Sequence, residues 1–216
     1  MPQVLGRIAE LAQAHALAVM GSVQCGQVQL PDSVQTLVLL GPHEPGFWET
    51  FTASPEYMDG APDPMDRWSR RVIDAMALQL GARAFYPFGV QPPHPFFSWA
   101  LATGRVWSSP VQFLVHDTAG LWASFRGALG FADILDQPAR AAPPCATCAR
   151  PCVTACPVGA LTPQGYDVPA CHAFLDSADG QHCLSGGCIV RAACPVSQTF
   201  GRRPEQSAFH MRQFHP

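Results

Sequence analysis

The stretches CATCARPCVTACP, residues 145–157, and CLSGGCIVRAACP, residues 183–195, decide what this 216-residue chain can fold into. Eight of its nine cysteines lie between Cys145 and Cys194, and both stretches end in Cys-Pro. The first follows Cys-x2-Cys-x3-Cys-x3-Cys-Pro; the second, which Cys171 precedes, follows Cys-x4-Cys-x5-Cys-Pro. Cysteines on a tight loop can wrap one side of a metal cluster, and a distant cysteine can close the remaining corner. Proline after that distant cysteine turns the chain away because it has no backbone N–H.

The spacing is close to the bacterial ferredoxin run Cys-x2-Cys-x2-Cys-x3-Cys-Pro, whose fourth cysteine ligates the other of two clusters. This resemblance implies two [4Fe–4S] clusters and one-electron transfer. By ferredoxin cross-ligation, the ligands of one cluster are Cys145, Cys148, Cys152 and Cys194, and those of the other are Cys156, Cys171, Cys183 and Cys188. Because the second run is stretched at both of its spacings, the second cluster is the one we expect to be missing if only one is present.

Zinc and disulfides are the alternatives for such a cysteine-rich region. Zinc takes the same thiolates, but its sites usually come as two Cys-x2-Cys pairs, and this chain has one. Residues 1–20 contain Arg7 as their one basic residue and no long apolar core, which argues against an export signal. We therefore expect a cytoplasmic protein with free thiols. His172 and His182 could replace a cysteine ligand, and Cys25, which stands apart, is predicted to be a small buried hydrophobe.

The composition argues against several classes of protein. All 13 basic residues are arginine, so a P-loop lysine and a Schiff-base lysine are both excluded. No G-x-G-x-x-G motif supports a Rossmann dinucleotide site. The net charge of −3 gives no general attraction to nucleic acid, and no apolar segment is long enough to span a membrane. We therefore expect neither nucleic acid nor a membrane as a partner.

The region before the cysteines is large enough for a domain with its own core, so two domains are predicted, residues 1–140 and 141–216. Apolar periodicity predicts helices over residues 4–19, 45–53, 66–80 and 95–103. Strands are predicted over residues 34–40, 83–86, 111–116 and 121–129, and a linker over 137–144. The fold class is α/β (α+β), with a mostly antiparallel or mixed sheet, followed by a cluster domain with little regular structure.

An aromatic and proline-rich stretch of the first domain is the candidate cofactor pocket. Its residues are His94, Phe96, Phe97, Trp99 and Trp107. His94 could meet a cofactor or metal, although a histidine bonded to a loop carbonyl is the commoner arrangement. Trp99 and Trp107 could equally belong to a core. His116 and Asp117 could form an acid/base pair or, more commonly, the hydrogen bonds of the turn predicted at residues 117–120.

The order of an α/β domain, the segment WSSPVQFLVHDTAGLWASFRGALGF (residues 107–131) and two Cys-Pro-ended runs resembles epoxyqueuosine reductase and the reductive dehalogenases. Those proteins combine a nitroreductase-like, cobalamin-binding domain with a two-cluster ferredoxin domain. The front part, through residues 34–40, the segment up to Trp68 and Arg126-Gly127, is also similar to CblC-type cobalamin-processing proteins. The resemblance implies a nitroreductase/CblC-like pocket domain over residues 1–140, a ferredoxin-like domain over 141–216, and cobalamin as the first candidate for the pocket.

The chain departs from the queuosine enzyme after the strand at residues 83–86. That enzyme carries an acidic proton donor there, whereas this chain reads PFGVQ over residues 87–91, so tRNA reduction is not carried over. The leading hypothesis is a cytoplasmic iron–sulfur redox protein, an oxidoreductase if it is an enzyme, whose clusters pass single electrons to a cofactor or substrate in the first domain, as in a cobalamin reductase or processing protein. The alternative is a plain ferredoxin-type carrier or subunit with a vestigial pocket. The expected partners are a corrinoid and an electron donor such as a ferredoxin, flavodoxin or flavin reductase.

Overall fold

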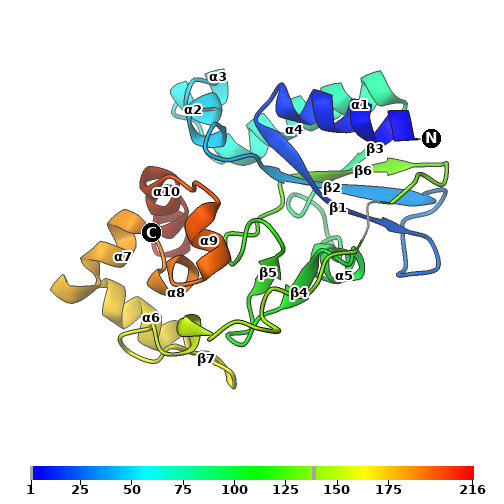
Figure 1. Ribbon diagram of the computed structural model, residues 1–216. Helices are drawn as coiled ribbons and strands as arrows, with labels where there is room; N and C mark the ends of the chain where they lie inside the picture. The colour runs from blue at the N-terminus through cyan, green and yellow to red at the C-terminus, as the bar shows by residue number, and fades with distance from the viewer. Residues whose placement is uncertain (1, 138–139) are drawn as a thin grey trace. The chain divides into compact units, whose positions relative to one another are not determined.

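The computed structural model describes residues 2–137 and 140–216, and its contacts divide the chain into two compact units (Figure 1). Unit 1 comprises Met1–Val106 and Ser124–Ala141, and unit 2 comprises Trp107–Ala123 and Ala142–Pro216. A border after residue 140, as the sequence predicts, would leave residues 107–123 in the first domain, whereas the structure groups them with the cysteine region. The predicted mixed α+β class is confirmed.

Unit 1 is built on an antiparallel sheet of four strands in the order β1-β2-β6-β3. The strands are β1 (Leu17–Gln24), β2 (Thr36–Pro42), β3 (Arg83–Phe85) and β6 (Gly127–Phe131). Every residue of β2 is buried, because the strand lies inside the sheet and both of its faces are covered. The sequence predicted this strand as buried on both faces, which is confirmed.

The helices of unit 1 pack mainly through apolar stripes. They are α1 (Pro2–Gln13), α2 (Phe47–Thr52), α3 (Pro55–Met58), α4 (Pro64–Leu80) and α5 (Phe96–Ala102). In Figure 1, α1 and α4 lie side by side over the sheet, in agreement with their mutual contacts and their contacts with its strands. The α4 helix buries Trp68, Val72 and Ile73, and it ends at Gly81, whose φ of 63° lies in the left-handed region that glycine adopts freely.

A buried ion pair joins α4 to the start of β6. The Arg126 guanidinium lies 2.7 Å from the Asp66 carboxylate, and it also stacks over the Phe88 ring at 5.4 Å. The backbone N–H of Arg126 donates to the Leu40 carbonyl of β2. The residue before the last strand of the sheet is therefore fixed by both its main chain and its side chain.

Two element predictions in unit 1 were wrong in their extent. The predicted helix over residues 4–19 ends at Gln13, and Leu17 begins β1, because Ala16 takes a left-handed φ of 52° that breaks the helix. The predicted strand over residues 121–129 forms only as β6. Its first half is held instead by a hydrogen bond from the Leu121 N–H to the Ser197 hydroxyl.

Unit 2 contains more regular structure than the sequence indicated. Its strand pairs are β4 (Val106–Ser108) with β5 (Leu114–His116), and β7 (Leu161–Thr162) with β8 (Gly165–Tyr166). Its α-helices are α6 (Val168–Leu175), α7 (Gln181–Gly186), α8 (Ile189–Ala192), α9 (Pro195–Thr199) and α10 (Pro204–Phe214). The expectation of little regular structure was therefore wrong. These helices are short, which explains why periodicity missed them. In the described part of the chain, no helix is both long and apolar enough to cross a membrane.

The core of unit 2 combines apolar side chains from residues 107–123 with the cysteine region. Val111, Val115 and Leu121 form one buried cluster with Cys152 and Cys194. Two of the predicted metal ligands thus lie in the hydrophobic core itself, where burial shields them from water.

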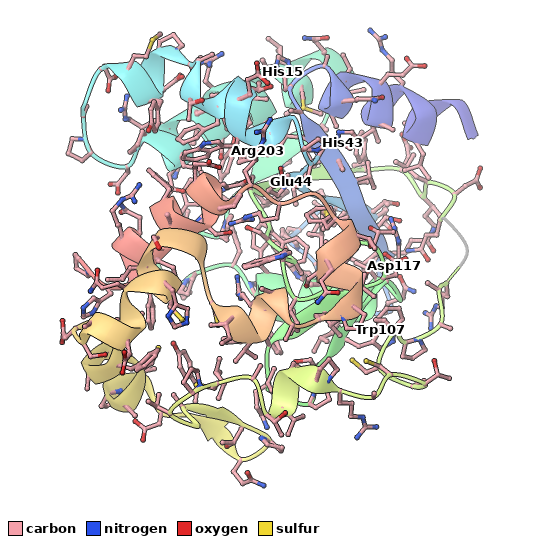
Figure 2. All side chains as sticks on the ribbon, turned by 60° about the vertical axis from the view of Figure 1, so that its left-hand side comes forward. His15, His43, Glu44, Trp107, Asp117 and Arg203 are labelled. Atoms are coloured by element: carbon pink, nitrogen blue, oxygen red, sulfur yellow. The ribbon has the colours of Figure 1, made fainter. Side chains whose placement is uncertain are left out.

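The predicted turn at residues 117–120 is present, and the His116 side chain accepts hydrogen bonds from its backbone. The His116 Nδ1 accepts hydrogen bonds from the N–H groups of Thr118 and Ala119 at 3.1 and 3.3 Å. Figure 2 labels Asp117 and Trp107, which both belong to the 107–123 segment of unit 2. The predicted turn hydrogen bonds of His116 are confirmed, and His116 Nδ1 also lies 2.9 Å from an Asp117 carboxylate oxygen, so the two side chains of the alternative acid/base interpretation are paired as well.

Candidate metal centres

Electrostatic interactions between the thiols link the eight clustered cysteines of unit 2 in the two sets of four that the sequence predicts. The members of the first group are Cys145, Cys148, Cys152 and Cys194. Burial raises the pKa of Cys145, and the nearby Cys148, Cys152 and Cys194 raise it further because thiolates repel one another. The pKa of Cys152 is raised in the same way, by burial and then by Cys194 and Cys148. Cys194 therefore lies with the first cysteine loop, although it follows that loop by about 40 residues.

The local structure explains how this first group forms. Arg150 takes a left-handed φ of 55° ahead of the short 3-10 turn Pro151–Val153, which carries Cys152 inward. The Arg150 N–H donates to the Cys148 sulfur at 3.3 Å. Cys194 is the residue before α9, and Pro195 occupies the first helical position, where its missing N–H costs nothing.

The members of the second group are Cys156, Cys171, Cys183 and Cys188. Burial raises the pKa of Cys183, and the other three cysteines of the group raise it further. Cys171 lies on α6 and Cys183 on α7, while Cys188 immediately precedes α8. The fourth member, Cys156, accepts a hydrogen bond from the Ala160 N–H at 3.3 Å. Two helices, the residue before a third helix and one loop thus each supply one thiol.

The second group lines a cavity of about 330 Å³. All four of its cysteines lie on the cavity walls, and most of the remaining lining is apolar or aromatic, including Phe113, Trp122, Leu161, Phe174 and Phe214. The charged side chains that line it are Arg191 and Arg202, with no carboxylate among the described lining residues. The first group differs, because Cys145 lies on the wall of another hollow that Ser108, Arg150 and Thr154 also line.

Two polar residues of the second group's surroundings were missed from the sequence. The Tyr166 hydroxyl is hydrogen-bonded to Cys171, and burial together with this bond raises the pKa of Tyr166 well above its ordinary value. The Arg191 guanidinium stacks 4.8 Å from the centre of the Phe113 ring and acts electrostatically on Cys188. The position of Arg191, three residues after Cys188 and therefore one helical turn away, was the signal that could have identified it.

The two candidate histidine ligands have other contacts. His172 Nδ1 lies 3.0 Å from Nδ1 of His215, whose Nε2 reaches Asp176 at 2.9 Å. His182 Nε2 lies 3.4 Å from the sulfur of Cys183. Within residues 2–137 and 140–216, no three His, Cys, Asp or Glu side chains are placed to hold a single metal ion.

The predicted pocket residues of unit 1 are mostly packed against one another. Trp99 is 1% exposed, and its ring N–H donates to the Gln29 carbonyl at 3.1 Å. His94 stacks on Trp99 with a ring separation of 5.6 Å and meets the edge of Phe85 at 5.4 Å. Phe96 is also buried and tilts against Trp99. The structure thus brings His94, Phe96 and Trp99 together as part of a core.

The remaining candidates lie elsewhere. Phe97 is 52% exposed on the outer face of α5. Trp107 belongs to unit 2 and packs against the core of that unit. The prediction that Cys25 is a buried hydrophobe was wrong, because Cys25 is exposed and its thiol lies 2.7 Å from the Gln35 side-chain oxygen. The β1–β2 hairpin that carries it is polar, which explains the exposure.

Comparison of the chain with protein-family models, with curated proteins and with solved structures finds no match in any of the three. The function must therefore be argued from the two cysteine groups and their surroundings.

Proposed function

We propose that unit 2 is a ferredoxin-like domain that binds two [4Fe–4S] clusters and that the protein transfers single electrons. When bound, such a cluster accepts and releases one electron. The observation that carries the proposal is the way the cysteines are divided. Three cysteines of each group come from the same part of the sequence, and the fourth comes from the other run. Cys194 joins the first group and Cys156 joins the second. This exchange of Cys-Pro cysteines is the ligation pattern of two-cluster ferredoxins.

The chemistry of both groups fits thiolate ligation of iron. Burial raises the pKa of Cys145, Cys152, Cys183 and Cys188, so these thiols favour the protonated form until a metal replaces the proton. Backbone N–H groups face several of the sulfurs and would offset part of the negative charge of a bound cluster. The apolar walls around the second group would keep water away from it. Free thiols of this kind persist in a reducing compartment, and we propose that this compartment is the cytoplasm.

Metal analysis tests this function directly. Protein purified without oxygen should contain about eight irons and eight sulfides per chain, as two cubane clusters require. About four irons would show that one group has no cluster, and the second group, with its stretched spacing, would be the first suspect. Zinc in place of iron would overturn the proposal.

The geometry supports a carrier or electron-transfer subunit better than an enzyme with its own pocket in unit 1. Trp99 and Phe96 are committed to a core, and Trp107 belongs to the other unit. On this proposal the chain accepts electrons from a donor such as a ferredoxin, flavodoxin or flavin reductase and passes them on. Unit 1, for which a nitroreductase-like fold remains our proposal, would then serve as a scaffold.

A corrinoid acceptor in unit 1 is the second candidate, and His94 is the observation in its favour. Its partly exposed ring is held in one orientation by Trp99 and Phe85, which is how a preorganised ligand is built. On this candidate, added cob(II)alamin should bind with a shift of its absorbance toward the base-off form. Phe97→Ala, which removes an exposed ring, should weaken binding several-fold, while the exposed Leu78→Ala should not. No binding at high micromolar concentration would reject this candidate and leave the carrier function.

A further inference from the structure

The two cysteine groups differ in the charge placed beside them. Arg191 lines the cavity of the second group, and its guanidinium is held against the Phe113 ring. The positive charge of Arg191 is stabilised by Cys188 and Tyr166 when these two groups are anionic. Arginine keeps its proton at any working pH, so this is a permanent positive charge. The first group has Arg150 as its neighbouring cation, and Arg150 is exposed, so that water screens its charge.

The two groups also differ in hydrogen bonding from side chains. The Tyr166 hydroxyl donates to the Cys171 sulfur in the second group. The N–H groups of Ile189 and Val190 favour the ionised thiols of Cys183 and Cys188, and the Ala160 N–H donates to Cys156. In the first group, the Arg150 N–H donates to the Cys148 sulfur, and the backbone N–H of Cys152 favours the ionised form of the Cys152 thiol.

Each of these differences acts in the same direction on reduction. A cluster gains one negative charge when it takes up an electron, and nearby positive charge and hydrogen bonds to its sulfurs stabilise that added charge. Arg191 is partly exposed and has no carboxylate among the described residues that line its cavity, so an anionic cluster there would supply its counter-charge.

Building on the two-cluster function proposed above, we infer that the cluster of the second group has the higher reduction potential, and that Arg191 is the residue that sets this order. An electron delivered to the cluster of the first group then moves to that of the second, which is reduced as the first is oxidised. Arg191 would ligate no iron. Its role would be to hold a positive charge beside the cluster of the second group. The chain thereby gains a direction of electron flow, from the cluster bound by Cys145, Cys148, Cys152 and Cys194 to the one inside the cavity.

An anaerobic redox titration followed by EPR tests this inference. The wild-type protein should show two reduction steps, and the step at higher potential should belong to the second group. Arg191→Gln should lower the equilibrium constant of that step about tenfold, which is 59 mV for one electron, and leave the other step unchanged. Arg191→Lys, which keeps the charge, should retain most of the potential. The matched control is Arg150→Gln, which removes the exposed cation beside the first group and should leave the higher step in place.

Two further measurements keep the test decisive. A Cys194→Ala protein, with the first cluster removed, should retain the higher step alone. If Arg191→Gln loses its second cluster, Tyr166→Phe offers a milder change that should lower the same step a few-fold. The inference is overturned if the first group is reduced first, or if the charge at position 191 leaves both steps unchanged. Those results require two clusters to be present, so they differ from the absence of iron that would defeat the proposed function.

Discussion

Replacement of Cys194 by alanine should halve the iron content of anaerobically prepared protein, from about eight to about four irons per chain. The variant removes the one ligand of the first group that comes from outside its loop. A cubane left with Cys145, Cys148 and Cys152 has an open corner that water and oxygen can attack. The structure supports this loss, because Cys194 acts on the thiols of Cys145 and Cys152.

Cys25→Ala is the matched control for this experiment. Cys25 is exposed on the β1–β2 hairpin of unit 1, so its loss should leave about eight irons in place. EPR of the reduced Cys194→Ala protein should show one remaining cluster signal. Loss of the second cluster with the first intact would mean that the ligands are assigned the wrong way round.

Gly120→Ala should destabilise unit 2 by about 2–4 kcal/mol. Gly120 has a φ of 57°, a left-handed conformation that costs a side-chain-bearing residue about 1–2 kcal/mol. A Cβ there would also collide with the main-chain nitrogen and the hydroxyl of Ser197, and such overpacking costs about 1–3 kcal/mol. Ser197 lies in α9, the helix that Cys194 precedes, so the damage should reach the first cysteine group.

Gly159→Ala separates these two costs. Gly159 also has a left-handed φ, 63°, but a Cβ there would meet no atom within 4 Å. We expect this control to lose about 1 kcal/mol, from backbone strain alone. Thermal unfolding followed by the visible absorbance of the clusters compares the two variants. Equal midpoints would show that the contact between Gly120 and α9 contributes nothing to stability.

The elements that the sequence predicted well are those whose pattern is decided locally. The apolar run of β2 and the periodic face of α4 each contain their own signal, and both formed close to the predicted bounds. The strand β1 was hidden because its apolar residues continue the pattern of α1 without a proline or glycine between them. The extent of β6 could not be predicted, because Leu121 is held by Ser197, which lies far away in the sequence.

The candidate site shows the same division. Cysteine spacing predicted the two sets of four thiols, from the exchange of Cys-Pro ligands that the ferredoxin pattern implies, and this assignment stays a prediction. It could not predict the surroundings of those thiols. The spacing of Arg191 from Cys188 was a usable signal, whereas nothing in the local sequence marks Tyr166, which joins the site only in the folded cavity. Trp107 was predicted to line a pocket of the first domain, but it belongs to unit 2. Nothing in its local sequence shows that residues 107–123 leave unit 1.

Because residues 107–123 belong to unit 2, neither unit is one continuous stretch of the chain. The chain passes from one unit to the other three times, after residues 106, 123 and 141. A fragment that begins at residue 142 would lack Val111, Val115 and Leu121 and would expose the core that surrounds Cys152 and Cys194. A single recombination point therefore cannot transplant the cysteine region onto another protein.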